Sequence, residues 1–250
     1  MNVRDKGVLI TGAAGGLGSA MARQLCQRGA RVVISDVDDQ AGQALADALV
    51  AQGHWARYVR LEVTSEAAWQ EAAAFTQAEC GRLDVLVNNA GINIRKPIEQ
   101  MSIEEWMKMM AVNTGSVFLG CKTAIPLMRA QGGGSIINIS SVCGLIGHRY
   151  TPEAYTASKG AVTLLTKSIA ARHGADNIRC NSVHPSTVDT PLVRQMLGDP
   201  DWAAQRLGEV PLGRLASDLD VAHLVCFLAS DGAAFINGAA LPVDGGVTAY

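Results

Sequence analysis

Short apolar runs alternate with helix-period segments along this chain of 250 residues, and this alternation restricts its fold more than any other feature. Helical periodicity follows several of these runs, at residues 38–52, 65–80 and about 102–130. Strands that alternate with helices predict a mostly parallel sheet with helices on both faces. We therefore expect an α/β fold with about seven strands. The expected strands lie at residues 7–11, 31–35, 57–63, 84–91, 135–140, 178–183 and 239–243.

The chain shows no internal division. It is 48% hydrophobic and 18% charged, which suits one large core, and no Pro/Gly/Ser-rich linker or fixed-period repeat interrupts it. We expect a single domain over residues 1–250. Residues 186–216 lack strand character and contain three prolines, at positions 191, 200 and 211. Loops of this length in compact domains are usually functional, so we expect this segment to be a substrate lid.

Charge and cysteine usage exclude several classes of protein. The net charge is -2 and the basic residues are scattered, so no nucleic-acid surface is expected. The longest uncharged stretch, 130–148, is broken by Gly and Ser and cannot span a membrane. The six cysteines form no CxxC and have no zinc-ligand spacing, so no metal is expected. Without an export signal at the N-terminus, we expect a cytoplasmic protein with free thiols.

A glycine-rich turn, TGAAGGLG at residues 11–18, directly follows the first expected strand and opens the first helix. Such a turn lets the backbone approach a pyrophosphate closely and directs helix N-terminal amides toward it. A tight strand-to-helix turn without a ligand is the alternative. The position in the first β–α unit favours the dinucleotide-binding interpretation and a doubly wound sheet of the Rossmann type.

Asp36 ends the second expected strand, 18 positions after Gly18. A carboxylate there can accept hydrogen bonds from both adenosine ribose hydroxyls and repels a 2′-phosphate. Val37 follows it, and no basic residue interrupts the glycine turn. These residues favour NAD over NADP, although Asp36 could also serve only as an acid near a helix N-terminus.

Tyr155 and Lys159 lie four positions apart in AYTASKG, so on a helix they share one face. A cation beside a phenol in a partly dry site favours the phenolate and lowers the pKa of the phenol. Thr151, Pro152 and Glu153 read as N-cap, N1 and N2 of this helix, which places Tyr155 near its positive end. The alternative for this spacing is a solvated surface pair.

Taken together, these motifs resemble the short-chain dehydrogenase/reductase family along essentially the whole chain. TGAAGGLG is similar to that family's TGxxxGxG turn, and NNAG at 88–91 is similar to its motif after the fourth strand. The resemblance implies reversible hydride transfer between an alcohol carbon and a nicotinamide cofactor. The remaining matches are Asn113, Ser141, Tyr155, Lys159 and HPSTVDTP at 184–191.

The resemblance also implies a role for each residue. Tyr155 would be the general acid/base, Ser141 would hydrogen-bond the substrate oxygen, and Lys159 would tune Tyr155 and hold the nicotinamide ribose. Asn113 would anchor a water that leads protons from Lys159 to solvent. Ser141 as a strand-end hydroxyl and Asn113 as a partner of backbone groups are the structural alternatives. The residues expected to bind the cofactor are Gly12, Gly16, Leu17, Gly18, Asp36, Glu62, Val63, Asn89, Tyr155, Lys159, Val188 and Thr190.

Three positions depart from the family pattern. Glu62 stands where relatives more often have Asp, in contact with the adenine amine. Thirteen residues separate Ser141 from Tyr155, one more than in many relatives, which should alter the shape of the substrate pocket. Ser186 stands where most relatives have glycine. None of these departures removes a residue of the expected catalytic set.

Other functions find less support. The chain has five histidines but no GxSxG elbow for a serine hydrolase. A non-catalytic dinucleotide-binding scaffold would be expected to lose Tyr155, Lys159 or Ser141, and all three are present. A 3-oxoacyl-thioester reductase remains the nearest enzymatic alternative, although such relatives usually favour NADPH.

The substrate is expected to be a small, largely apolar secondary alcohol or ketone, cyclic ones included, because the expected pocket is largely apolar and has no dedicated cation-binding pair. His184 could also face this pocket. By resemblance, we expect a homotetramer built through the helix after Ser102, the Tyr155 helix and the C-terminal segment. The residues expected to line the pocket are Asn93, Ser141, Cys143, Leu145, His148, Tyr150, Ser186, Met196 and Trp202.

Overall fold

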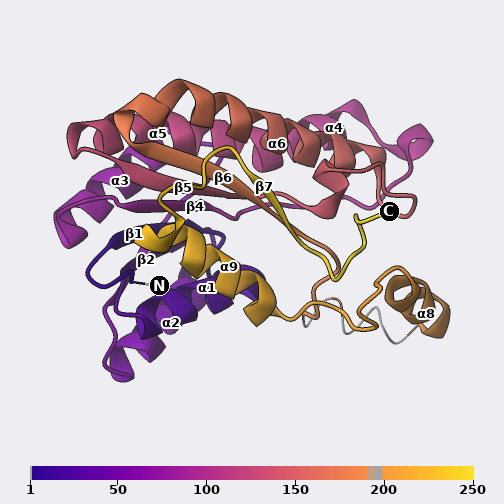
Figure 1. Ribbon diagram of the computed structural model, residues 1–250, viewed down its shortest axis with the longest axis horizontal. Helices are drawn as coiled ribbons and strands as arrows, with labels where there is room; N and C mark the ends of the chain where they lie inside the picture. The colour runs from indigo at the N-terminus through magenta and orange to yellow at the C-terminus, as the bar shows by residue number, and fades with distance from the viewer. Residues whose placement is uncertain (1, 191–192, 194–198) are drawn as a thin grey trace.

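A seven-stranded parallel sheet forms the centre of the molecule (Figure 1). The structure is a computed structural model that describes residues 2–190, 193 and 199–250. The strand order is β3-β2-β1-β4-β5-β6-β7, and every neighbouring pair is parallel. The expected doubly wound α/β fold is confirmed. The strands are β1 Gly7–Thr11, β2 Arg31–Asp36, β3 Ala56–Arg60, β4 Val85–Asn88, β5 Gly134–Ile139, β6 Ile178–Pro185 and β7 Ala240–Val243.

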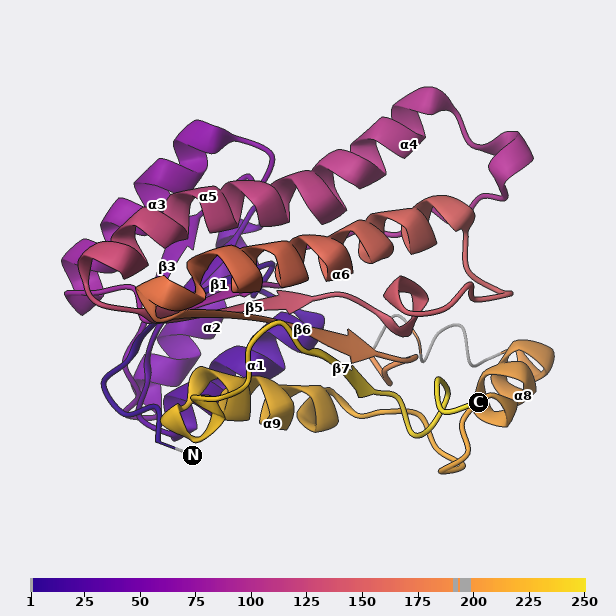
Figure 2. The same cartoon turned by 45° about the horizontal axis from the view of Figure 1, so that its top comes forward.

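Helices cover both faces of the sheet. Figures 1 and 2 show α1, α2 and α9 on one face and α3, α4, α5 and α6 on the other, while α8 lies beyond the carboxyl ends of β6 and β7. A π-helical turn, Ala111–Gly115, joins α4 to α5 without a break. The helices are α1 Gly16–Gln27, α2 Asp39–Ala51, α3 Glu66–Cys80, α4 Ile103–Met110, α5 Ser116–Ala130, α6 Glu153–His173, α8 Pro200–Gly208 and α9 Asp218–Ala229.

Two apolar cores lie on the two faces of the sheet. In β1, Val8 and Ile10 belong to the core under α1, α2 and α9, whereas Leu9 belongs to the core under α3, α5 and α6. Successive side chains of a strand point to opposite faces, so a strand that is buried on both faces must be apolar throughout. This explains why β1 appears in the sequence as a continuous apolar run.

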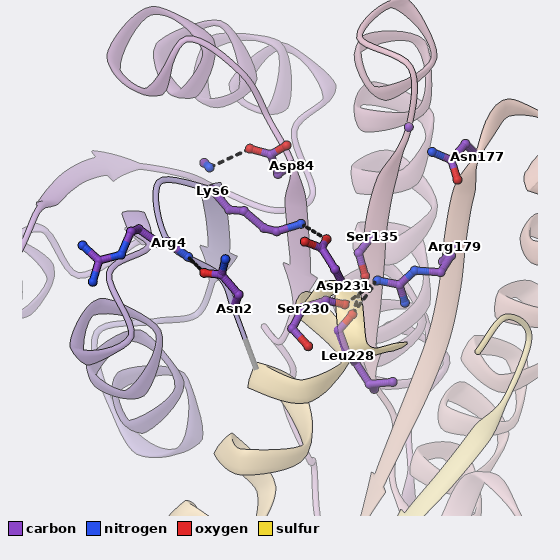
Figure 3. Close-up of polar contacts among 12 residues, drawn as sticks. Asn2, Arg4, Lys6, Asp84, Ser135, Asn177, Arg179, Leu228, Ser230 and Asp231 are labelled. Carbon is purple, nitrogen blue, oxygen red and sulfur yellow. Dashed lines mark hydrogen bonds and ion pairs between the residues drawn. The ribbon is translucent and has the colours of Figure 1, made fainter. Parts of the chain in front are cut away.

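Polar contacts close the amino-terminal edge of the sheet, where α9 ends (Figure 3). The carbonyl of Leu228 accepts hydrogen bonds from Ser135 Oγ at 3.0 Å and from Arg179 at 2.8 Å. Lys6 pairs with Asp231 at 2.6 Å, just before β1 begins. Ser135 and Arg179 thus satisfy a carbonyl that the helix end leaves without an intrahelical partner, so α9 is fastened to the sheet by its last turn.

The carboxyl ends of the strands form the opposite edge, where ligands bind in open α/β sheets. β1 has β2 on one side and β4 on the other, so the order of the strands reverses there. The glycine-rich turn follows β1, Asn89 follows β4 and Ser141 follows β5. The fold therefore brings the sequence motifs to one edge of the sheet, from separate parts of the chain.

Local structure differs from the sequence-based expectation at three places. β3 ends at Arg60, because the chain turns at Glu62, whose carbonyl accepts from Ser65 N at 3.0 Å. Pro152 is the N-cap of α6, and Thr151 Oγ1 lies 3.1 Å from His148 Nδ1 instead of capping the helix. The expected lid contains a helix, α8, whose N-cap Asp199 accepts from the amide of Asp201 at 3.0 Å.

Candidate active site

The glycine-rich turn leaves the N-terminus of α1 open to a ligand. Gly12 and Gly16 have φ angles of 60° and 52°, a region that suits glycine. Gly15 is the N-cap, no side chain caps the helix and no acidic residue lies in its first turn. Gly15 and Gly16 are exposed, and a Cβ added to either would meet no atom within 4 Å. Uncapped amides beside open space suit a pyrophosphate.

Asn89 and Thr11 hold this turn in place. The Asn89 side chain donates to the carbonyls of Thr11 and Gly12, both at 2.9 Å. Thr11 Oγ1 accepts from the amides of Asn89 and Ala90, both at 3.0 Å. Gly18 packs on the same turn, since a Cβ there would lie 2.3 Å from the Gly12 carbonyl oxygen. The Asn89 side chain therefore holds the glycine-rich turn in place. The absence of a side chain at Gly18 lets this turn pack closely on α1.

Asp36 stands at the end of β2 beside the glycine-rich turn. Its carboxylate accepts from Ala14 N at 3.0 Å, Val37 N at 2.8 Å and Asp38 N at 3.2 Å. The carboxylate thus joins the turn to the end of the strand, next to the space in front of α1. A nearby cation, Arg60, is held by Asp39 at 2.8 Å and by the Val37 carbonyl at 2.7 Å.

The other residues expected at the adenosine end lie around the same edge. Glu62 is exposed and its carboxylate accepts from the amide and hydroxyl of Thr64 at 3.1 and 2.9 Å. Val63 is buried, and its carbonyl accepts from Trp69 Nε1 at 2.9 Å. Leu17 packs its side chain against the apolar core. Together with the glycine-rich turn and Asp36, this edge fits a dinucleotide.

Asn113 occupies the π-helical turn between α4 and α5 and is fully buried. Its Oδ1 accepts from Ile92 N at 2.8 Å, and its Nδ2 donates to the Ile92 carbonyl at 2.9 Å and to Ser158 Oγ at 3.0 Å. A Cβ added to Gly91 would lie 3.3 Å from Asn113 Oδ1 and 3.5 Å from Lys159 Nζ. Both polar atoms therefore border one small space beside Gly91.

Lys159 is buried in the middle of this arrangement, with 4% of its surface exposed. Its ammonium donates to the Ile139 carbonyl at 2.8 Å and lies 5.8 Å from the centre of the Tyr155 ring. Burial lowers the pKa of Lys159 to about 8, because desolvation disfavours the charged form. The lysine therefore lies behind Tyr155 on α6, as the four-residue spacing predicts.

Ser141 and Tyr155 meet at the edge of the cavity. Their hydroxyls are hydrogen-bonded to one another. The Ser141 hydroxyl also accepts from Cys143 N at 3.2 Å, and its backbone carbonyl accepts from His184 Nδ1 at 2.7 Å. The turn Val142–Gly144 begins here, directly after β5, and fixes where the Ser141 side chain points.

The expected lowering of the Tyr155 pKa is not found in the cofactor-free protein. Burial, with a smaller contribution from Cys143, raises the pKa of Tyr155 to about 12. The hydrogen bond with Ser141 and the charge of Arg95 act in the opposite direction, and burial outweighs both. The expectation was wrong because it left out the desolvation of the phenol, while the Lys159 ammonium is directed toward the Ile139 carbonyl.

A cavity of about 570 Å³ opens beside Tyr155 and Ser141, within the usual size range of small-molecule sites. Val188 and Thr190 line it, and Val188 forms a bridge with Ala216 that closes the base of the expected lid. Most of the pocket residues expected from the sequence are present. They are Asn93, Ser141, Cys143, His148, Tyr150, Ser186 and Trp202.

The lining departs from the expectation in composition. Leu145 does not line the cavity, and His184 is fully buried between Ser141 and Ser182. Met196 lies outside the described residues. The pocket is not largely apolar, because charged side chains that the sequence analysis missed reach it from the loop after β4, the turn before α6 and the end of α8. These are Arg95, Lys96, Arg149, Glu153, Arg206 and Glu209.

Within residues 2–190, 193 and 199–250, no group of three or more His, Cys, Asp or Glu side chains is arranged to hold a metal ion. The six cysteines are buried and free. In the same part of the chain, no helix is both long and apolar enough to cross a membrane.

Known proteins resemble this chain over almost its full length. A family model described as enoyl-(acyl carrier protein) reductase matches residues 12–248. A cyclopentanol dehydrogenase from Comamonas sp. (strain NCIMB 9872) is 44% identical over 247 residues, which cover 99% of this chain and 98% of that protein. A trans-4-hydroxycyclohexanecarboxylate dehydrogenase from Sinomonas cyclohexanicum is 42% identical over 253 residues, 99% of this chain and 94% of that protein.

A solved structure shares the fold. A gluconate 5-dehydrogenase from Burkholderia cenocepacia J2315, in complex with NADP and tartrate, superposes with a TM-score of 0.94. It is 34% identical, and the match covers 100% of this chain and 97% of that one. The sequence relatives and the structural neighbour are thus all dehydrogenases by name.

Proposed function

Because the chain belongs to the short-chain dehydrogenase/reductase family, we propose that it oxidises a cyclic secondary alcohol to the ketone with NAD. It is a dehydrogenase, and its cofactor is a nicotinamide dinucleotide. The observation that carries the proposal is that Ser141 and Tyr155 both line the cavity, with Lys159 buried behind Tyr155. These groups surround the place where an alcohol oxygen would lose its proton.

The chain's own residues handle the proton and the oxygen. Tyr155 removes the hydroxyl proton of the alcohol as general base, and returns one in the reverse reaction. Ser141 hydrogen-bonds the same oxygen and stabilises the negative charge that develops on it. When bound, the nicotinamide accepts the hydride from the alcohol carbon, so the carbon is oxidised and the cofactor is reduced.

Lys159 and Asn113 connect Tyr155 with solvent. The lysine ammonium favours the phenolate when the proton has moved, which offsets part of the cost of burying that charge. Lys159 Nζ and Asn113 Oδ1 border the same space beside Gly91. A water in that space would have two polar partners and would carry the proton away from Lys159.

Asp36 supports NAD rather than NADP. Its carboxylate lies beside the open N-terminus of α1, where a ribose 2′-phosphate would meet a negative charge. Arg60, a cation near the end of β2, is bound by Asp39 and by the Val37 carbonyl. A free ribose hydroxyl can donate to the carboxylate, whereas a phosphate cannot.

Relatives and pocket size support a cyclic substrate. The two sequence relatives are named for a cyclopentanol and for a hydroxycyclohexanecarboxylate. The cavity of about 570 Å³ has room for a five- or six-membered ring beside Tyr155. A 3-oxoacyl-thioester reductase is the alternative, and it would reduce the 3-keto group of an acyl thioester with NADPH instead of oxidising a ring alcohol.

A homotetramer is the proposed assembly. Phe118 on α5 is 52% exposed and Leu164 on α6 is 69% exposed, and both helices cover the same face of the sheet. Phe235 and Tyr250 near the C-terminus are also highly exposed. Apolar side chains are therefore exposed at two separate places. Two kinds of subunit interface in a tetramer would cover them.

One assay tests the proposed function. Cyclopentanol, cyclohexanol and a linear secondary alcohol are each offered with NAD or NADP, and reduced-cofactor absorbance is followed. An acetoacetyl thioester with NADPH or NADH tests the alternative. We expect oxidation of the cyclic alcohols with NAD. Turnover of the thioester alone, or of no alcohol at all, would contradict the proposal.

A further inference from the structure

The cavity beside Tyr155 contains an unusual share of unsatisfied polar atoms. Five buried side-chain polar atoms among the described residues have no hydrogen-bond partner. Three of them line this cavity: Ser186 Oγ, Arg206 Nε and Glu209 Oε1. Buried polar groups normally have partners, because an unmade hydrogen bond is costly. Their clustering in one cavity points to a polar ligand that supplies the missing partners.

Arg206 is the buried cation of this group. It comes from α8, has 8% of its surface exposed, and lies 3.3 Å from Glu209 Oε2. Its NH2 group donates to the Tyr150 carbonyl at 3.0 Å, and its guanidinium lies over the rings of Trp202 and Tyr150. These contacts fix the guanidinium and leave Nε as a donor without an acceptor.

Basic side chains outnumber acidic ones in the cavity wall. Arg95, Lys96, Arg149 and Arg206 line it, against Glu153 and Glu209. Glu209 is shared between Arg206 and His148, each at 3.3 Å. The positive charge of Arg206 also contributes to lowering the pKa of Arg95, after burial. Two guanidiniums in the wall of one cavity form a site that an anion would stabilise.

Arg95 links this charge to the reacting hydroxyl. It follows β4, is exposed in the cavity, and lies close enough to Tyr155 to contribute to lowering the pKa of the phenol. A ligand that reaches Ser141 and Tyr155 with one oxygen therefore has Arg95 and Arg206 in the wall of the same cavity. Guanidinium groups bind carboxylates in paired hydrogen bonds.

We propose that the substrate is a ring alcohol that carries a carboxylate, which Arg95 and Arg206 bind while the hydroxyl lies at Ser141 and Tyr155. This inference rests on the proposed function and names its substrate class. The ring remains largely apolar and the charge is confined to one substituent. The carboxylate oxygens would accept from the Arg206 Nε donor and would separate the charges of the two guanidiniums.

The test compares an acid with its neutral counterpart. Trans-4-hydroxycyclohexanecarboxylate and the corresponding carboxamide are assayed with NAD in the wild-type enzyme and in Arg95→Gln. We expect kcat/KM to favour the acid by about 10- to 100-fold in the wild type, the range of charged hydrogen bonds. Arg95→Gln should remove most of this preference through KM, whereas an effect of Arg95 on Tyr155 would change kcat for both substrates by the same factor.

Arg149→Gln is the matched control. Arg149 is exposed like Arg95, lines the same cavity and loses the same charge, and its guanidinium lies over the Tyr150 ring at 5.5 Å. The acid preference should survive in this variant within about threefold. Arg206→Gln is a second test of the same site. The thermal midpoint of unfolding is measured for this variant, to detect any loss of packing around α8.

Each outcome has a separate meaning. The inference is overturned if the wild-type enzyme oxidises the carboxamide as efficiently as the acid. It is also overturned if Arg95→Gln slows both substrates equally, because Arg95 would then act on Tyr155. If cyclopentanol and cyclohexanol are oxidised but the acid is not favoured, only the inference fails. If no ring alcohol reacts with NAD, the proposed function fails with it.

Discussion

Under the proposed mechanism, the environment of Tyr155 sets the proton chemistry of this enzyme. Burial raises the pKa of the phenol to about 12 and lowers the pKa of Lys159 to about 8. At neutral pH in the cofactor-free protein, the phenol is therefore protonated and the lysine is largely charged. Alcohol oxidation needs the deprotonated phenol, because the phenolate accepts the hydroxyl proton of the alcohol. A positive nicotinamide ring nearby favours the phenolate, in the same way as any close cation.

This arrangement predicts a pH dependence. Because the phenol must lose its proton to act as a base, kcat/KM for alcohol oxidation should rise between about pH 7 and about pH 10. The rate of ketone reduction, which uses the protonated phenol, should stay nearly constant over the same range, because the pKa of the phenol lies near 12. Initial rates in both directions at constant ionic strength provide the measurement. A flat profile for oxidation would argue against Tyr155 as the base.

Asp36 offers a test of cofactor choice. Asp36→Asn keeps the size of the side chain and removes its charge, so the preference for NAD over NADP in kcat/KM should fall about tenfold or more. Asp38→Asn is the control, since the Asp38 side chain accepts from Ala41 N in α2. An unchanged NAD/NADP ratio in Asp36→Asn would remove Asp36 from the ribose site.

At the scale of elements, the glycine-rich turn and α1 must pack closely to expose the helix N-terminus. Gly18→Ala would place a methyl group 2.3 Å from the Gly12 carbonyl oxygen and 2.7 Å from the Ala13 Cα, both backbone atoms. We expect a loss of about 1–3 kcal/mol in the free energy of unfolding and weaker NAD binding. Denaturant unfolding and NAD titration measure the two effects.

Gly15→Ala is the matched comparison in the same turn. The φ angle of Gly15 is -149°, and an added Cβ would have no atom within 4 Å. The cofactor-free variant should therefore unfold within about 0.5 kcal/mol of the wild type. Equal destabilisation by both substitutions would show that the turn is not held by close packing at Gly18.

Sequence patterns predicted which helices and strands form more accurately than they predicted where these elements begin and end. The apolar runs located all seven strands, and the four-residue spacing placed Lys159 behind Tyr155 on α6. The predicted start of α6 was wrong. In the folded chain the Thr151 hydroxyl contacts His148, so Pro152 is the N-cap. Capping depends on which partner a side chain finds, and here that partner was not visible in the local sequence.

The substrate cavity was the least predictable part of the whole molecule. Arg95 and Arg206 are separated by more than a hundred residues and line one cavity because α8 lies beyond the carboxyl ends of the strands. A scattered basic residue has no local pattern that marks it as part of a site. By contrast, motifs on neighbouring strands of a parallel sheet share one edge, which is why the glycine-rich turn, Asn89 and Ser141 could be expected to lie together.

Assembly can be tested on the whole molecule. We expect light scattering coupled to size exclusion to give a mass four times that of one chain. Leu164→Glu would place a charge on the exposed face of α6, where Leu164 is 69% exposed, and should shift the mass toward smaller species. Glu71→Gln, on the exposed side of α3, serves as the control. A monomeric wild-type protein would contradict the proposed tetramer.

The central claim is that one phenol, held between Ser141 and Lys159, moves the proton during NAD-linked oxidation of a ring alcohol. The most direct test is the initial rate of cyclohexanol oxidation by Tyr155→Phe, with NAD binding measured by titration in the same preparation. The account predicts a rate lower by about 10³-fold or more with NAD still bound, because the ring is kept and only the hydroxyl is lost. A Tyr155→Phe enzyme that retains the wild-type rate would contradict it.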